Sequence, residues 1–271
     1  MVHACIHAAE GRLLFRTWRE ARALWERLRR GPALLAAVLM PTHLHAQLIE
    51  AERYDLLIDG LRGYALWRNA ARGERGPVFQ HDEKPTPIDG REHVERMRRY
   101  IHLNPCRDKY VNDPLAWPFS THRDVVGLSA WPICRPVHNP ARFHAYVAAD
   151  PAVTPGSQLP VRSAAANGTA AELRRVYAAV SALTRTTVRG LAEHGPARDL
   201  FLRAARVLTT ASSSQIARLA GVDGSTVRRC PRRTDAVIER VALVMGDPRF
   251  PLLFDGDLRN LSSWSQHRHL R

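Results

Sequence analysis

The segment DPAVTPGSQLPVRSAAANGTAA, residues 150–171, divides this chain into two unlike parts. It contains Pro, Gly, Ser and Asn without a sustained apolar period, which is typical of a linker. A length of 271 residues suits one large domain or two modest ones, and the segment favours two. We therefore expect a first domain at residues 1–149, a linker at 150–171, a second domain at 172–250 and a tail at 251–271.

Patterns typical of strands and helices alternate in the first part. Strand patterns cover VHACIH, residues 33–40 and residues 43–49, and helical spacing covers residues 18–28, 54–72 and 91–104. Pro105 is expected to end the last of these helices. The interleaving predicts a small α+β domain.

The second part has only helical patterns, and it predicts an all-α domain. Apolar residues recur at helical spacing in residues 171–183, 187–194, 197–209, 214–220, 225–230 and 236–245.

The charge indicates a polyanionic partner. The formal net charge is +14, and the shorter C-terminal part carries 18 basic and 9 acidic residues. With 45% hydrophobic residues the chain can fill a core, so a wholly disordered basic tail is excluded.

The longest apolar run, residues 32–40, is far shorter than the ~20 residues that span a bilayer. No signal peptide pattern and no C-x-x-C pair are present, so we expect a cytoplasmic protein without disulfides or membrane contact.

Two histidines in LMPTHLHAQLI form the first candidate site. On a strand, His43 and His45 lie two positions apart, so both imidazoles leave the same face and can share one metal ion. Chance gives roughly 0.6 such matches in a chain with this many histidines, and a second match, His267 and His269, occurs in a charged terminal run. The N-terminal strand places His3, Cys5 and His7 on one face, where edge packing is the favoured interpretation.

A tyrosine and an asparagine in RRYIHLNPCR form the second candidate site. Tyr100 and Asn104 are four residues apart on the predicted helix, so phenol and carboxamide share one face. Taken alone, a tyrosine in such a helix is usually a half-buried core residue. An asparagine before a proline usually marks the end of a helix.

MPTHLH followed by RRYIHLNPCR resembles the REP-associated tyrosine transposases, a branch of the single-tyrosine HUH superfamily of DNA-cleaving enzymes. The PVFQ and WPFSTHRDVVG segments extend the resemblance over roughly residues 1–147. It implies a ferredoxin-like fold with an antiparallel sheet, Tyr100 as nucleophile, and His43, His45 and Asn104 as metal ligands. The family has an arginine shortly after the Asn-Pro pair, and Arg107 occupies that position here. We expect Arg107 to contact DNA. Phe79-Gln80 is followed by HDEK, whereas the family commonly has an Arg and an aromatic residue there.

The resemblance implies transesterification of DNA. Two imidazoles and an amide oxygen suit Mg²⁺ or Mn²⁺, which would polarise the scissile phosphate for attack by a phenol. The products are a 5′-phosphotyrosine and a free 3′-hydroxyl, and the expected substrate is single-stranded or hairpin DNA. We expect a monomer or a homodimer.

The stretch SSQIARLAGVDGSTVRR fits helix-turn-helix spacing, with Ala217, Gly221 and Val227 at the small, turn and apolar positions. Ser225, Thr226, Arg228 and Arg229 are expected on the exposed side of the second helix, facing duplex DNA. Residues 172–245 also resemble the C-terminal duplex-binding domain of the bacterial chromosomal replication initiator, with Gly224 where that family has His.

The residues leave two alternatives open. One is a catalytically silent DNA-binding regulator that uses only the helix-turn-helix, and the other is a toxin-like metal-dependent RNase, which would not use Tyr100. The set of His43, His45, Tyr100 and Asn104 favours a DNA strand transferase.

Overall fold

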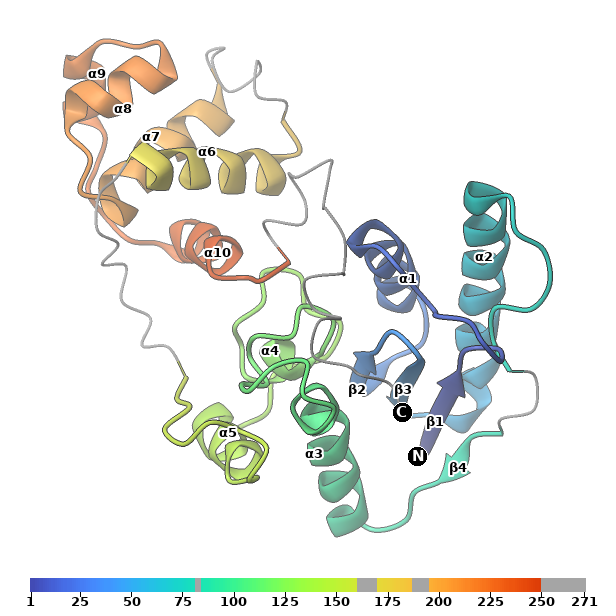
Figure 1. The fold of residues 1–271 in the computed structure, drawn as a ribbon. Helices are drawn as coiled ribbons and strands as arrows, with labels where there is room; N and C mark the ends of the chain where they lie inside the picture. Colours follow the sequence, from blue (N-terminus) through green and yellow to red (C-terminus); the bar gives the residue numbers. More distant parts are fainter. Residues whose placement is uncertain (81–83, 160–169, 187–194, 250–271) are drawn as a thin grey trace. The chain divides into compact units, whose positions relative to one another are not determined.

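The computed structural model describes residues 1–80, 84–159, 170–186 and 195–249 (Figure 1). The chain forms two compact units. The first comprises Met1–Gly127 and Trp131–Leu159, and the second includes Leu128–Ala130 and the helices between Ala170 and Met245. Residues 150–159, which the sequence assigns to the linker, belong to the first unit: Val153 is buried, and the amide of Thr154 donates to the carbonyl of Asn112 at 2.8 Å.

The N-terminal unit is a mixed α+β structure built on a four-stranded antiparallel sheet with strand order β2-β3-β1-β4. Its elements are β1 (Val2–His7), α1 (Trp18–Arg30), β2 (Leu34–Leu39), β3 (His43–Leu48), a 3-10 turn (Ala51–Arg53), α2 (Tyr54–Arg72), β4 (Thr86–Pro87), α3 (Arg91–Arg107), α4 (His122–Val125) and α5 (Pro140–Ala148). The sequence did not predict β4, α4 or α5.

The pairing of β1 with β3 gathers the histidines of both strands. His7 lies opposite His43, and Cys5 lies opposite His45. Side chains of paired residues leave the same face of an antiparallel sheet. The alternate residues of β1, Val2, Ala4 and Ile6, are buried on the other face. One face of the sheet is therefore apolar, and the other carries imidazoles.

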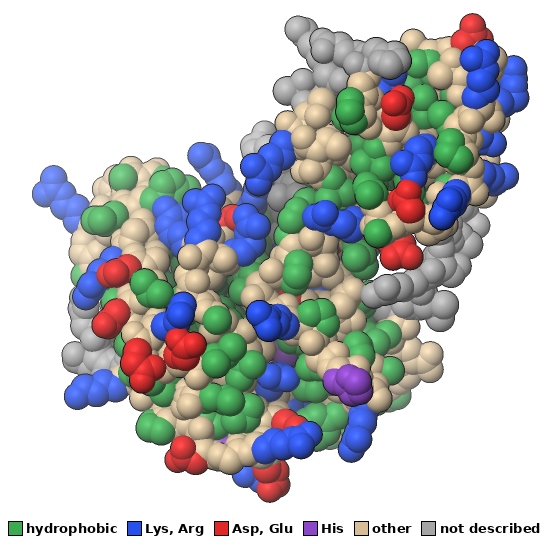
Figure 2. Space-filling model, turned by 180° about the vertical axis from the view of Figure 1, so that it is seen from behind, with side chains coloured by type: hydrophobic (Ala, Val, Ile, Leu, Met, Phe, Trp, Pro, Cys, Tyr) green, Lys and Arg blue, Asp and Glu red, His purple; other side chains and the backbone are tan. Residues whose placement is uncertain are grey.

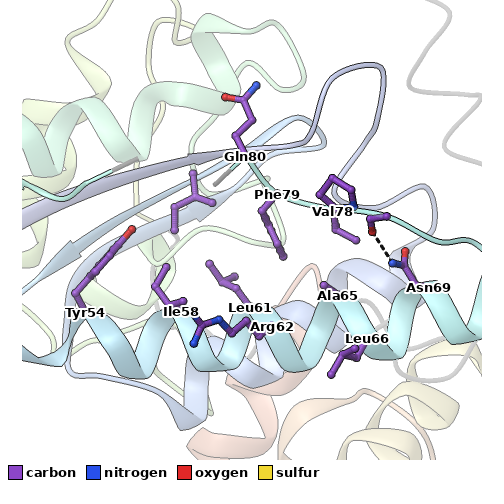
Figure 3. Close-up of a pocket in the computed structure, with 13 residues that line it drawn as sticks. Tyr54, Ile58, Leu61, Arg62, Ala65, Leu66, Asn69, Val78, Phe79 and Gln80 are labelled. Atoms are coloured by element: carbon purple, nitrogen blue, oxygen red, sulfur yellow. Dashed lines mark hydrogen bonds between the residues drawn. The ribbon is translucent and has the colours of Figure 1, made fainter. Parts of the chain in front are cut away.

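The apolar face is covered from the side of α2. A cavity of about 470 Å³ lies where residues 77–80 face α2, and Ile6 of β1 contributes to its wall. Figure 3 shows Phe79 and Leu61 among its lining residues, with Asn69 donating to the carbonyl of Gly76. Because Ile6 points away from the imidazoles, this cavity is separate from the predicted site.

Helix α3 lies against β2 and β3 and extends beyond its expected end. It continues to Arg107, so the prediction that Pro105 ends the helix is wrong. Pro105 lacks only the amide that would donate to the carbonyl of Ile101. Beyond it, the amides of Asp108 and Tyr110 donate to the carbonyls of Asn104 and Pro105, both at 2.9 Å, so the helical turns continue past the proline. Tyr100, Asn104 and Arg107 consequently follow one another along one side of the helix.

A chain of buried histidines joins α3 to α4 and α5. The ring of His102 contacts the hydroxyl of Thr121 at 3.0 Å and the ring of His122 at 3.3 Å, and His122 contacts His144 at 3.0 Å. His144 also lies 3.2 Å from the hydroxyl of Ser157. Burial, together with the charge of Arg98, lowers the pKa of His102 to about 3, and burial likewise lowers the pKa of His122 and His144. The three imidazoles are neutral in the folded protein.

The neutral state of His122 makes the stability of the N-terminal unit depend on pH. Its pKa when folded lies below the ~6.5 of an unfolded histidine, so the unfolded chain binds the proton more readily. We expect the free energy of unfolding to fall as the pH drops from 7 to 5.5, by up to ~1.4 kcal/mol per pH unit for each such imidazole. Denaturant titrations should give a weaker pH dependence for His122→Gln than for the matched exposed change His138→Gln. Equal pH dependence of the two variants would contradict this.

The C-terminal unit is helical in all the elements that the structure describes. These are α6 (Ala170–Thr184), α7 (Pro196–Leu208), α8 (Ser213–Ala220), α9 (Gly224–Arg229) and α10 (Ala236–Met245). The helix predicted at residues 187–194 and the tail lie outside the described residues. None of the described helices combines the length and apolar character needed to cross a membrane.

Candidate active site

The imidazole of His43 and the amide of Asn104 meet between β3 and α3. Nε2 of His43 lies 3.0 Å from Oδ1 of Asn104, and Nδ1 of His43 lies 3.0 Å from the hydroxyl of Thr42. Asn104 is only 5% exposed, so its amide is held by the interior of the unit. The structure thus brings together two of the predicted metal ligands.

His45 and Tyr100 meet beside this pair. The ring of Tyr100 stands nearly perpendicular to the ring of His45, with centroids 5.3 Å apart, and the rings of His43 and His45 are 4.8 Å apart. His45 is buried, whereas Tyr100 is 39% exposed. Tyr100 is therefore partly exposed to solution while its ring contacts the ring of His45.

His3 completes the cluster, and the sequence did not predict its role. Nε2 of His3 lies 3.0 Å from Nδ1 of His45, and the two rings stack at 5.1 Å. This contact engages Nδ1 of His45, so a metal ion could bind only through Nε2 of this ring. Burial and the neighbouring charges of His43 and His3 lower the pKa of His45 to about 3, so this imidazole is neutral, as a metal ligand must be. The register of β1 against β3 creates this contact, and it cannot be predicted from the sequence of either strand alone.

The separation of two of the predicted donors suits a six-coordinate cation. With bonds near 2.1 Å, neighbouring ligand atoms around an octahedral ion are about 3 Å apart, and the atoms of His43 and Asn104 have this separation. The hydroxyl of Thr42 can accept a hydrogen bond from Nδ1–H of His43, and in that tautomer the lone pair of Nε2 would be available to a cation. Among the described residues, no three His, Cys, Asp or Glu side chains gather closely enough to bind a metal. The candidate set therefore depends on the amide oxygen of Asn104.

Arg107 lies beside the candidate nucleophile. Its guanidinium carbon is 5.8 Å from the ring centroid of Tyr100, and it donates to Oδ2 of Asp150 at 2.8 Å. Burial acts to raise the pKa of Asp150, but the hydrogen bond from Arg107 and the charge of Arg99 outweigh burial and lower it. The carboxylate of Asp150 is charged, and it holds the guanidinium of Arg107 next to the ring of Tyr100.

The four DNA contacts predicted in the C-terminal unit lie on one short helix. Ser225 and Thr226 are half-buried on α9, and Arg228 and Arg229 are exposed at its end. Figure 2 shows Arg side chains, drawn in blue, gathered along one edge of this unit. Arg206 of α7 donates to the carbonyl of Arg228 at 2.9 Å, which holds the end of α9 against α7.

Neither the family models nor the curated proteins compared with this chain give a match. One solved structure is similar to it: a REP-associated tyrosine transposase bound to a REP hairpin. The two chains are 20% identical, and the match covers 60% of this chain and 92% of the other, with a TM-score of 0.36.

Proposed function

We propose that this protein is a DNA strand transferase that cleaves and rejoins single-stranded or hairpin DNA through Tyr100. The observation that carries the proposal is the cluster between β3 and α3. An exposed phenol stands against one imidazole, and a second imidazole shares a 3.0 Å contact with an amide oxygen. The element order βαββαβ and the strand order β2-β3-β1-β4 support a ferredoxin-like arrangement of the N-terminal unit.

The chemistry assigned to these residues is phosphoryl transfer to tyrosine. The phenolic oxygen of Tyr100 gives up its proton to solvent and forms a bond to phosphorus as the bond from phosphorus to the 3′ oxygen breaks, and the departing 3′ oxygen takes up a proton. The ester retains the energy of the phosphodiester, so a 3′-hydroxyl can later displace Tyr100 and rejoin the strands. Arg107, beside the ring of Tyr100, offers a positive charge to the phosphate.

The proposed cofactor is Mg²⁺ or Mn²⁺, held by His43, His45 and Asn104. When bound, it would polarise the scissile phosphate and offset the charge that develops during attack.

A direct test is a search for the covalent intermediate. The full chain should form an adduct with hairpin-bearing single-stranded DNA in the presence of Mg²⁺ or Mn²⁺. The adduct should survive denaturation, because a phosphotyrosine ester does not depend on the fold. Absence of any adduct under conditions where the DNA is cleaved would reject the tyrosine mechanism.

The proposed role of the C-terminal unit is to bind duplex DNA as a helix-turn-helix. A reciprocal pair of hydrogen bonds between Ser212 and Gln215 caps the start of α8, and Gly221, with φ of 64°, ends it in a left-handed turn. Val227 of α9 is buried, while Arg228 and Arg229 are exposed. These contacts support a second helix presented by its polar side to a duplex.

Duplex binding should weaken steeply as salt rises, because arginines release counterions from the phosphates. For the full chain, Arg228→Ala with Arg229→Ala should lower duplex affinity at low salt. The plot of log affinity against log salt has a negative slope. Its steepness should decrease by about 1 for each arginine that no longer binds a phosphate. Arg240→Ala, an exposed arginine on α10, is the control and should leave the slope unchanged. The same slope in the double variant and the wild type would reject this interface.

A further inference from the structure

Tyr146 presents an exposed aromatic ring beside Arg99, the residue that precedes the candidate nucleophile in the sequence. It lies on α5, is 40% exposed, and its ring is covered in part by Arg99 of α3, with the guanidinium carbon 4.9 Å from the ring centroid. Nε of Arg99 also donates to the carbonyl of Tyr146 at 2.9 Å. Because Arg99 directly precedes Tyr100 in α3, the aromatic ring of α5 is attached to the helix that carries the nucleophile.

Asp150 connects this pair to Arg107. The same oxygen, Oδ2, lies 2.8 Å from Arg107 and 3.7 Å from Arg99. Two guanidiniums around one carboxylate leave a net charge of +1, and Asp150 is only 9% exposed. Arg107 faces the ring of Tyr100, and Arg99 faces the ring of Tyr146. Two exposed tyrosines and two cations are thus held around one buried anion.

An exposed tyrosine alone is common on protein surfaces and signals nothing. This tyrosine differs because its neighbouring guanidinium is fixed by three interactions, which reduces the conformational entropy that a ligand must overcome. An aromatic face with a fixed cation beside it is what binds an unpaired base and its phosphate in sites for single-stranded nucleic acid. Within a duplex, the base would have no free face to offer.

We propose that Tyr146 and Arg99 form a subsite that stacks one unpaired base of the DNA strand next to the scissile phosphate. The proposal rests on the function proposed above and specifies how the strand is held. Arg107 and Arg99 contact consecutive phosphates, and Tyr146 stacks the base between them. The subsite tolerates any base, since stacking uses the ring face and not the hydrogen-bonding edge.

The test measures binding without cleavage, in full-length protein carrying Tyr100→Phe. Single-stranded oligonucleotides with 2-aminopurine at successive positions around the cleavage point report stacking as a loss of fluorescence. We expect quenching at one position beside the scissile phosphate. Tyr146→Ala should abolish that quenching and weaken binding about tenfold, whereas Tyr146→Phe, which keeps the ring, should preserve both within about twofold. Thermal unfolding checks that each variant is folded, and Tyr146→Leu provides a second, bulkier variant without an aromatic face.

The outcomes separate this subsite from the proposed function. Equal affinity and unchanged quenching in Tyr146→Ala and Tyr146→Leu, while wild-type protein still forms the adduct, would overturn the subsite and leave the transferase standing. Loss of quenching in Tyr146→Ala, in a protein whose wild type forms no adduct, would support the subsite and reject the transferase.

Discussion

Tyr100→Phe is expected to form no covalent adduct and to leave hairpin-bearing single-stranded DNA uncut in Mg²⁺ or Mn²⁺. The change removes a single oxygen, and the ring that contacts His45 stays in place. Folding and DNA binding should therefore persist, because the packing of α3 against the sheet is unaltered. Denaturing gels with labelled DNA measure the adduct and the cleavage together, and filter or fluorescence binding measures the retained affinity.

Tyr54→Phe is the matched control for the loss of a phenolic oxygen. Tyr54 begins α2 and lines the separate cavity on the apolar face, so its variant should cleave like the wild type. Cleavage that continues in Tyr100→Phe and yields 5′-phosphate ends would mean that water is the nucleophile. The assignment would then change to a hydrolytic nuclease.

The spacing of the predicted site residues within each element was sufficient to place them on common faces. Two histidines separated by one residue must share a strand face, and Tyr100 and Asn104 must share a helix face, whatever the rest of the fold. Spacing within one element cannot predict which other element packs against that face. The contact between His43 and Asn104 depends on how α3 lies on β3, which is set by burial along the whole helix.

The contact of His3 with His45 could not be predicted from the sequence, for the same reason. The sequence places His3 on one strand face with Cys5 and His7, but the N-terminal position of the strand favours edge packing. The structure places β1 in the interior of the sheet, between β3 and β4, and this brings His3 against His45. Sheet order is a long-range property, and no local pattern in VHACIH encodes it.

Apolar periodicity predicted the extent of α8 closely, placed the end of α3 too early and missed α5. The start of α8 follows from Ser212 and Gln215, and its end follows from Gly221. By contrast, α3 continues past Pro105, and α5 begins at Pro140 with Asn139 as its cap, in a stretch without a strong apolar period. Tyr146 lies on that unpredicted helix, so its proximity to Arg99 could be found only in the structure.

His43→Ala should impair the site in a different way from Tyr100→Phe, because the nucleophile remains. Loss of one imidazole should weaken metal binding by at least about tenfold, measured as Mn²⁺ affinity by titration with electron paramagnetic resonance. Cleavage in Mg²⁺ should be lost, since Mg²⁺ prefers oxygen ligands and retains its waters when a site is incomplete. Excess Mn²⁺ should restore part of the cleavage, because mass action compensates for weaker binding and Mn²⁺ accepts the remaining imidazole of His45 more readily.

His138→Ala removes an exposed imidazole outside the site and is the matched control, with unchanged Mn²⁺ affinity and cleavage. Asn104→Asp provides the opposite change, since a carboxylate in place of the amide beside His43 should tighten Mn²⁺ binding. The two variants separate loss of a ligand from loss of fold, because a damaged unit would bind Mn²⁺ weakly in both. If His43→Ala and Asn104→Asp both bind Mn²⁺ as the wild type does, His43 and Asn104 are not metal ligands. Their 3.0 Å contact would then serve only to orient α3 on the sheet.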